Sequence, residues 1–119
     1  MTRAIILFGH GSRDPQWREP MDAVARRIRA SIAQVEVRCA FLELDTPELA
    51  SAVAELVEAG VDSIRIVPMF LGAGRHARED LPRRVEQCRR AHPTVHFDLQ
   101  PSVGENPRVL DLLAAIALD

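Results

Sequence analysis

The stretch AIILFGHG, residues 4 to 11, is a short apolar run that ends at a glycine, followed by a histidine between two glycines. A continuous apolar run of this length is typical of a strand that is buried on both faces of a parallel sheet. A second run of this kind, SIRIVPMF at 63–70, predicts another buried strand. The centre of the fold is therefore expected to be a parallel sheet covered by helices.

Two further runs alternate apolar and polar residues, VEVRCAFLE at 35–43 and TVHFDLQ at 94–100. Such alternation predicts strands with one wet face, which suits the edges of a sheet. With the two continuous runs in the centre, the strand order is 2-1-3-4. This is a flavodoxin-like α/β three-layer sandwich with a four-stranded parallel sheet and right-handed crossovers.

Helical spacing of apolar residues follows each predicted strand, and each predicted helix has a start signal. Proline after a capping residue marks the first, second and fourth helices, and an aspartate marks the third. These signals are Asp14-Pro15, Thr46-Pro47 with the threonine as cap, Asp80 as cap, and Asn106-Pro107. Four strand–helix units in 119 residues predict one domain over 1–119.

Composition excludes several classes of function. A net charge of −2 argues against nucleic-acid binding driven by bulk electrostatics. No apolar run approaches the roughly 20 residues that span a bilayer, so no membrane association is expected. The first strand begins too early for a signal peptide, and Cys39 and Cys88 lie in apolar patterns without metal-site spacing. We expect buried, inert thiols and a cytoplasmic protein.

Ligands bind such sheets at the carboxyl ends of the strands, where the strand order reverses. His10 follows the first strand, and His76 lies in a glycine-rich loop after the third, so both are expected at this reversal point. Glu43 ends the second strand at the same edge, and Ser102 and Glu105 follow the fourth. Two imidazoles and a carboxylate suit first-row divalent metal ions, and histidine accepts a proton near neutral pH.

Arginine supplies all 15 basic residues. Arg13, Arg75 and Arg78 lie near the expected site, where guanidinium groups could bind carboxylates in a bidentate manner, or could simply be solvated. The glycine-rich loop at 71–76 lacks the lysine and the hydroxyl residue of a P-loop, which argues against nucleotide binding. Trp17 fits a wall of the site or a core position equally well. We interpret the glycines on either side of His10 as clearing space for a large flat ligand.

Three motifs together carry a resemblance to a known family: GHGSRD at 9–14, FLELDTP at 41–47 and FLGAGRHAREDLP at 70–82. They closely resemble the small sirohydrochlorin chelatases, the single-domain class II chelatases. The resemblance implies an enzyme, a lyase that inserts a divalent metal ion into sirohydrochlorin without ATP. The metal would be Co²⁺, with Fe²⁺ or Ni²⁺ as alternatives. No cofactor beyond this ion and no partner beyond a second copy in a homodimer are expected.

The resemblance also implies roles for particular residues. His10 would be a metal ligand and the proton acceptor, and His76 the second metal ligand. Thr46 would contact the tetrapyrrole together with the loop that leads to the second histidine, namely Leu71, Gly72, Ala73, Gly74, Arg75 and His76. An acidic residue would suit position 46 better, and Glu43 is the candidate for that catalytic role. Arg13 would bind carboxylates of the substrate.

Two other functions use the same residues. A non-catalytic carrier of divalent metal ions could bind its cargo with the same two histidines. A phosphoryl-transfer enzyme with a histidine nucleophile would carry an Arg-His-Gly motif, but Gly9 occupies the position of that arginine here. Without the adjacent positive charge to hold a phosphate, this second alternative is the weaker one.

Overall fold

The computed structural model describes residues 2–119 and contains one sheet of four parallel strands in the order β2-β1-β3-β4. The strands are β1 (Arg3–Gly9), β2 (Glu36–Phe41), β3 (Ser63–Pro68) and β4 (His96–Leu99). Central β1 pairs with β2 on one side and with β3 on the other. The predicted order and the central position of the two continuous apolar strands are confirmed.

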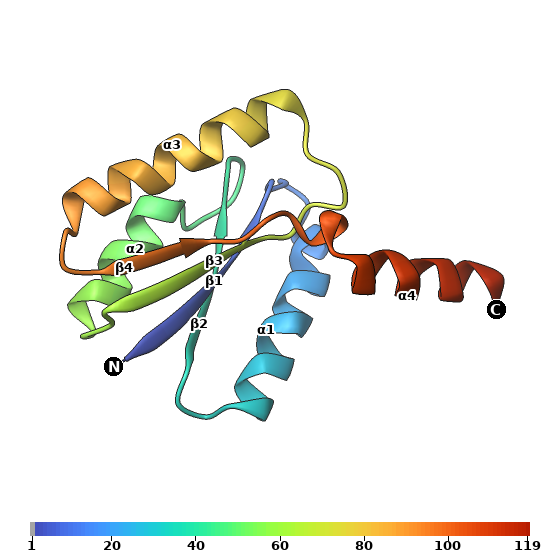
Figure 1. Cartoon of the computed structure of the whole chain (residues 1–119), viewed down its shortest axis with the longest axis horizontal. Helices are drawn as coiled ribbons and strands as arrows, with labels where there is room; N and C mark the ends of the chain where they lie inside the picture. The colour runs from blue at the N-terminus through green and yellow to red at the C-terminus, as the bar shows by residue number, and fades with distance from the viewer. Residues whose placement is uncertain (1) are drawn as a thin grey trace.

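Helices lie on both faces of the sheet (Figure 1). A short 3-10 helix, η1 (Pro15–Arg18), leads into α1 (Glu19–Ser31), which covers one face. The other face is covered by α2 (Leu49–Glu58) and α3 (Arg75–Ala91). After β4 come a second 3-10 helix, η2 (Val103–Glu105), and α4 (Pro107–Leu118). Among residues 2–119, every helix falls short of the length and apolar character needed to cross a bilayer.

The strands bury apolar side chains on both faces because successive residues of a strand point in opposite directions. Ile6 and Ile66 pack with α2 and α3, whereas Leu7 packs with Met21 and Ala25 of α1. All five side chains are at most 7% exposed. This double burial is the reason that β1 and β3 read as continuous apolar runs in the sequence.

Two predicted helix starts are wrong. The second helix begins at Leu49 rather than at Thr46-Pro47, because the Phe41 N–H donates to the Pro47 carbonyl at 2.9 Å and holds this segment beside the end of β2. Glu48, not Thr46, is the residue before the first helical turn.

The third helix begins at Arg75, five residues before the predicted cap Asp80. Ala77 and Leu81 are one turn apart and both buried, so packing on the sheet extends the helix toward its N-terminus. Pro82 then lies inside the helix, where it removes one backbone hydrogen bond. The segment with His76 is therefore the first turn of a helix rather than a loop.

The other predicted signals for helix starts and ends are confirmed. Asp14 and Asn106 accept hydrogen bonds from backbone N–H groups two residues further along, each ahead of a proline in the first turn. Gly60 follows α2 with φ +93°, the left-handed conformation that ends many helices.

The fourth helix, however, does not cover the sheet as expected. Figure 1 shows α4 leading away from the layers beyond the end of β4.

Replacing a buried leucine of α2 should destabilise the protein far more than replacing an exposed one. Leu56 is fully buried between α2 and the sheet, so Leu56→Ala should lower the free energy of unfolding by about 2–5 kcal/mol. Leu71 is 67% exposed, and Leu71→Ala should change it by less than about 0.5 kcal/mol. Urea unfolding measures both, and equal effects would contradict the placement of α2.

Candidate functional site

Backbone hydrogen bonds tie together the segments that follow the four strands. The N–H of Leu42 donates to the carbonyl of Gly9 at 2.9 Å, and the N–H of Glu43 donates to that of His10 at 3.1 Å. The segment after β4 is tied in by the N–H of Gly104, which donates to the Phe70 carbonyl at 3.0 Å. These bonds continue the pairing of the sheet past its strands, so the candidate residues lie on a fixed edge.

His10 and Glu43 form the central pair of this edge. The Nε2 atom of His10 lies 3.1 Å from Oε1 of Glu43, and the two side chains are 53% and 56% exposed. The hydrogen bond between their own backbones fixes their separation. An imidazole beside a carboxylate, both open to solvent, can bind a metal ion or accept a proton from a ligand above them.

The glycines around His10 serve protein packing, and our interpretation of them as space for a ligand is wrong. A Cβ at Gly11 would overlap the backbone carbonyl of Glu43, and Gly11 also has φ +102°. A Cβ at Gly9 would collide with Met21 and approach the ring of Trp17. Only glycine lets the chain after β1 approach the segment after β2 closely enough for the His10–Glu43 contact.

Open space lies instead along the segment after β3. Nothing is within 4 Å of a Cβ placed on Gly72 or Gly74, and Leu71 is among the most exposed large hydrophobic residues. His76 is exposed on the first turn of α3. The structure thus pairs His10 with Glu43 and places His76 on the segment that follows the neighbouring strand. Within residues 2–119, no three His, Cys, Asp or Glu side chains come together as a preformed metal site.

The remaining candidates are exposed, and some of them already have a hydrogen-bond or ion-pair partner. Arg13 and Arg78 are exposed, and Arg75 is an exposed helix residue whose Nε lies 3.1 Å from Glu79. Thr46 is exposed, and its N–H donates to the Asp45 side chain at 2.7 Å. Ser102 and Glu105 cap η2 by bonding to each other's backbone.

Arg18 is a structural residue of this edge that the sequence patterns did not reveal. Its guanidinium lies 4.7 Å from the centre of the Phe41 ring and 3.1 and 3.5 Å from carboxylate oxygens of Asp22 and Asp45. The hydrogen bond to Asp22 raises the pKa of the Arg18 guanidinium above its usual value. Arg18 therefore links α1 to the segment after β2. The i,i+4 spacing of Arg18 and Asp22 was the only sequence signal for it.

Trp17 combines the two roles that the sequence left open. Its ring packs edge-on against Phe41, with the centroids 6.2 Å apart, and would lie 3.2 Å from a Cβ placed on Gly9, yet it stays 40% exposed. The side chain therefore packs on the core and forms part of the surface next to His10.

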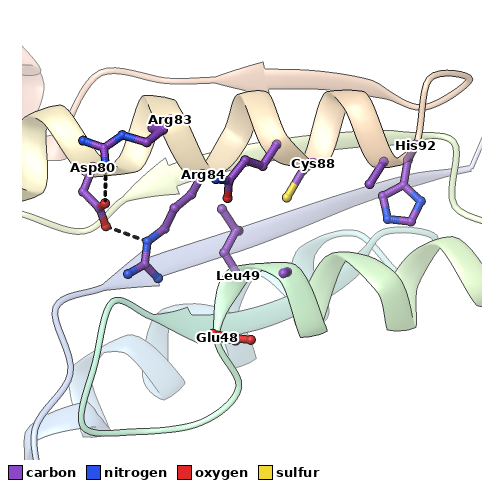
Figure 2. A pocket seen from close by; sticks show the side chains of 10 residues that line it. Glu48, Leu49, Asp80, Arg83, Arg84, Cys88 and His92 are labelled. Carbon is purple, nitrogen blue, oxygen red and sulfur yellow. Dashed lines mark hydrogen bonds and ion pairs between the residues drawn. The ribbon is translucent and has the colours of Figure 1, made fainter.

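The two cysteines do not contribute metal ligands. Burial raises the pKa of the Cys88 thiol, and burial together with the nearby Asp22 carboxylate raises that of Cys39. Cys88 lines a cavity of about 490 Å³ between α2 and α3 (Figure 2). Among its polar lining residues, Asp80 lies 2.6 Å from the Arg84 guanidinium and 3.7 Å from that of Arg83. This cavity contains none of the candidate site residues. Cys88 is buried as expected, whereas Cys39 is only partly buried, and the raised pKa values agree with thiols of low reactivity.

Comparison with known proteins identifies relatives over most of the chain. The model of the CbiX family matches residues 4–118. A sirohydrochlorin cobaltochelatase of Methanopyrus kandleri is 38% identical over 80 residues, which cover 67% of this chain and 56% of the relative. A sirohydrochlorin ferrochelatase of Bacillus subtilis is 27% identical over 110 residues, 92% of this chain and 42% of the relative. The chain thus spans about half of the length of these two proteins.

A solved structure agrees with the fold. The crystal structure described as a CbiX protein of cobalamin biosynthesis from Marinobacter aquaeolei VT8 superimposes with a TM-score of 0.83 at 34% identity. The match covers 97% of this chain and 93% of that one. The family and fold expected from the sequence motifs are confirmed, and the curated relatives are themselves named as chelatases.

Adding one methyl group at Gly11 should disrupt this edge, whereas adding one at Gly72 should not. Gly11→Ala places a Cβ against the Glu43 carbonyl in a left-handed backbone and should cost about 2 kcal/mol or more of unfolding free energy. Gly72→Ala meets open space and should be nearly neutral or slightly stabilising. Thermal and urea denaturation compare the two, and a wild-type stability of Gly11→Ala would rule out the close approach.

Proposed function

Because the chain belongs to the CbiX family, we propose that it inserts a divalent metal ion into sirohydrochlorin without ATP. The ion is a substrate in this reaction rather than a resident cofactor. Co²⁺ is our first choice, with Fe²⁺ and Ni²⁺ as alternatives, since relatives carry both cobaltochelatase and ferrochelatase names. The observation that supports the proposal best is the exposed His10–Glu43 pair, 3.1 Å apart on the carboxyl edge of the sheet.

Metal insertion requires that two pyrrole N–H protons leave the ring while the ion exchanges its water ligands for ring nitrogens. As the ion passes from His10 to the ring, the imidazole nitrogen that held it can accept one pyrrole proton and pass it to the surrounding water, because the side chain is half exposed. The same nitrogen can then accept the second proton and release it in the same way. The Glu43 carboxylate stabilises the positively charged imidazolium that results. General-base catalysis of this kind contributes roughly 10²- to 10⁴-fold in rate.

The ion must be held and then released, which suits neutral imidazoles better than a closed thiolate cage. We assign His10 and His76 as the protein ligands of the incoming ion. The segment from Leu71 to His76, with Gly72 and Gly74 open to solvent, is our proposed contact surface for the macrocycle. Thr46, Arg13 and Arg75 complete the proposed substrate site, with the two arginines directed at the carboxylates of the tetrapyrrole.

We further propose that the chain acts as one domain in a cytoplasmic homodimer. The resemblance to the small chelatases supports the dimer, and two-fold dimers are the commonest soluble oligomers. A second copy would supply surface that a chain of 119 residues cannot provide for a substrate as wide as a tetrapyrrole.

Loss of the proposed base should abolish metal insertion without unfolding the protein. In an anaerobic assay with sirohydrochlorin and Co²⁺, followed by absorbance, His10→Ala should lower the rate by about 10² or more. Glu43→Gln should cause a smaller loss, because it removes only the charge beside His10. His92→Ala, a histidine in the cavity between α2 and α3, is the matched control and should leave the rate unchanged.

Two results of this assay would contradict the proposal. One is a wild-type rate for His10→Ala in a protein with an unchanged circular dichroism spectrum. The other is Co²⁺ binding by the wild-type protein with no acceleration of the absorbance change, which is the result expected of a metal carrier.

The second ligand can be tested without the tetrapyrrole. His76→Ala should weaken binding of Co²⁺ in calorimetric titration by at least about 10-fold, since loss of outer-shell partners alone costs roughly 10- to 100-fold. His96→Ala changes an exposed histidine of β4 and serves as the control. An unchanged Co²⁺ affinity of His76→Ala would remove His76 from the ligand set.

A further inference from the structure

Helix α4 differs from the other helices in that it has an apolar surface but no protein to pack against. None of its residues is buried, and its neighbour η2 is its main contact. Nine large hydrophobic side chains are exposed among residues 2–119, and five of them belong to α4: Leu110, Leu112, Leu113, Ile116 and Leu118. A helix of 12 residues is marginal in water without tertiary packing, so another surface is needed to stabilise α4.

Part of one face of the sheet, on the side of α1, is not covered by any helix in the described residues. On the face covered by α1, the apolar cluster includes residues of β1, β2 and β3 but none of β4. Beside it, a depression of about 380 Å³ extends over β1, β3 and β4. Ile5, Ile32 and Val35 supply its apolar part, and Arg3 and Arg65 are among its polar residues. No helix of the same chain covers this depression in the part of the protein that the structure describes, and we refer to it below as the uncovered face.

The start of α4 is held in a direction that leads away from its own sheet (Figure 1). Gly104 of η2 is pressed so closely against the Leu71 carbonyl that a Cβ would overlap it. Ser102 and Glu105 cap η2 reciprocally, and the Asn106 side chain caps α4 by accepting from the Arg108 N–H at 2.9 Å. Turning α4 back onto its own sheet would require these contacts to break.

We propose that α4 docks on the uncovered face of a second copy of this chain, and that the second copy returns the same contact. Each copy has an apolar helix, α4, that packs on no sheet, and an uncovered face on which no helix packs. In a two-fold dimer, the α4 of each copy can cover the uncovered face of the other. At 1.5 Å per residue α4 is about 18 Å long, close to the roughly 20 Å of the six-residue strand β3.

Charge is complementary as well. Asp111 is the one acidic residue between positions 107 and 118, and it forms no ion pair within residues 2–119. Arg3, on the uncovered face, likewise has no ion-pair partner among the described residues. Docking of α4 on a second copy brings these two unpaired charges to the same interface, where they can form a pair.

This inference rests on the proposed homodimer but not on the proposed chemistry. It specifies an interface on the α1 side of the sheet, whereas a dimer formed over the exposed edge near Leu71 would use a different surface. The two arrangements are distinguished by which exposed leucine the dimer depends on.

Sedimentation equilibrium of the full chain without metal or tetrapyrrole tests the interface. The wild-type protein should be a dimer, and Leu113→Arg should raise the dimer dissociation constant by at least about 30-fold, as expected of a central interface residue. Leu71→Arg replaces another exposed leucine by the same residue and should leave the constant unchanged. Circular dichroism checks that both variants remain folded. A monomeric wild-type protein, or dissociation by Leu71→Arg but not by Leu113→Arg, overturns the proposal.

Crosslinking identifies the surface that α4 contacts, even if Leu113→Arg fails to fold. The background carries Cys39→Ser and Cys88→Ala, and one sample adds Arg65→Cys while a second adds Leu113→Cys. After the two samples are mixed and equilibrated, a short bis-maleimide should join position 65 of one copy to position 113 of the other, as peptide mass spectrometry would show. Links only between two copies of position 113 indicate that α4 packs against α4 and overturn the proposed surface.

Because neither experiment measures metal insertion, the outcomes separate this inference from the proposed function. If the protein forms a dimer that depends on Leu113 but shows no chelatase activity, the proposed interface is supported and the proposed metal insertion is refuted. If the protein is an active chelatase whose dimer dissociation constant does not change in Leu113→Arg, the proposed metal insertion is supported and the proposed interface is refuted.

Discussion

The candidate site depends on how closely the segments after β1 and β2 approach each other. Gly11 lies against the Glu43 carbonyl in a left-handed backbone, and the Glu43 N–H donates to the His10 carbonyl. With the backbones fixed at this distance, the imidazole and the carboxylate meet at 3.1 Å while both side chains stay about half exposed. The glycine motif therefore acts through backbone geometry, and its side-chain chemistry is confined to His10.

This arrangement positions two reactive groups without burying them. Arg18, Trp17 and Phe41 pack behind the edge and fix η1 and α1 against it, while His10 and Glu43 stay about half exposed. Exposure weakens the attraction between the pair through solvent screening, but it leaves both groups accessible to a wide ligand and to water. An open pair of this kind suits the proposed uptake of an ion and its release to a macrocycle.

The two faces of the sheet differ in how completely they are covered. The face under α2 and α3 buries residues from all four strands, whereas the α1 face leaves β4 without apolar partners. The polar residues of β4 on that side, His96 and Asp98, explain why the strand alternates in sequence, and the Asp98 carboxylate is paired with Arg65 at 3.1 Å. The polar face of this edge strand is satisfied by solvent and by the ion pair, whereas α4 has apolar side chains and none of its residues is buried.

Sequence alone determined the features that depend on local pattern. Continuous apolar runs placed β1 and β3 in the centre and alternation placed β2 and β4 at the edges, because a strand buried on both faces has an unbroken apolar run and a strand buried on one face alternates. The capping residues Asp14 and Asn106 marked two helix starts. The motifs were also sufficient to identify the family. The prediction that Glu43 lies at the same edge of the sheet as His10 followed from the geometry of parallel strands.

Tertiary structure decided what local pattern cannot encode. The start of α3 at Arg75 depends on burial of Ala77 and Leu81 against the sheet, which outweighs the signal from Asp80 and Pro82. The role of Gly9 and Gly11 depends on neighbours 12 and 32 positions away along the chain, Met21 and Glu43, and was misread for that reason. The direction of α4 depends on the packing of Gly104 against Leu71. In each case the deciding contact joins residues that are distant in sequence, and no periodicity records such a contact.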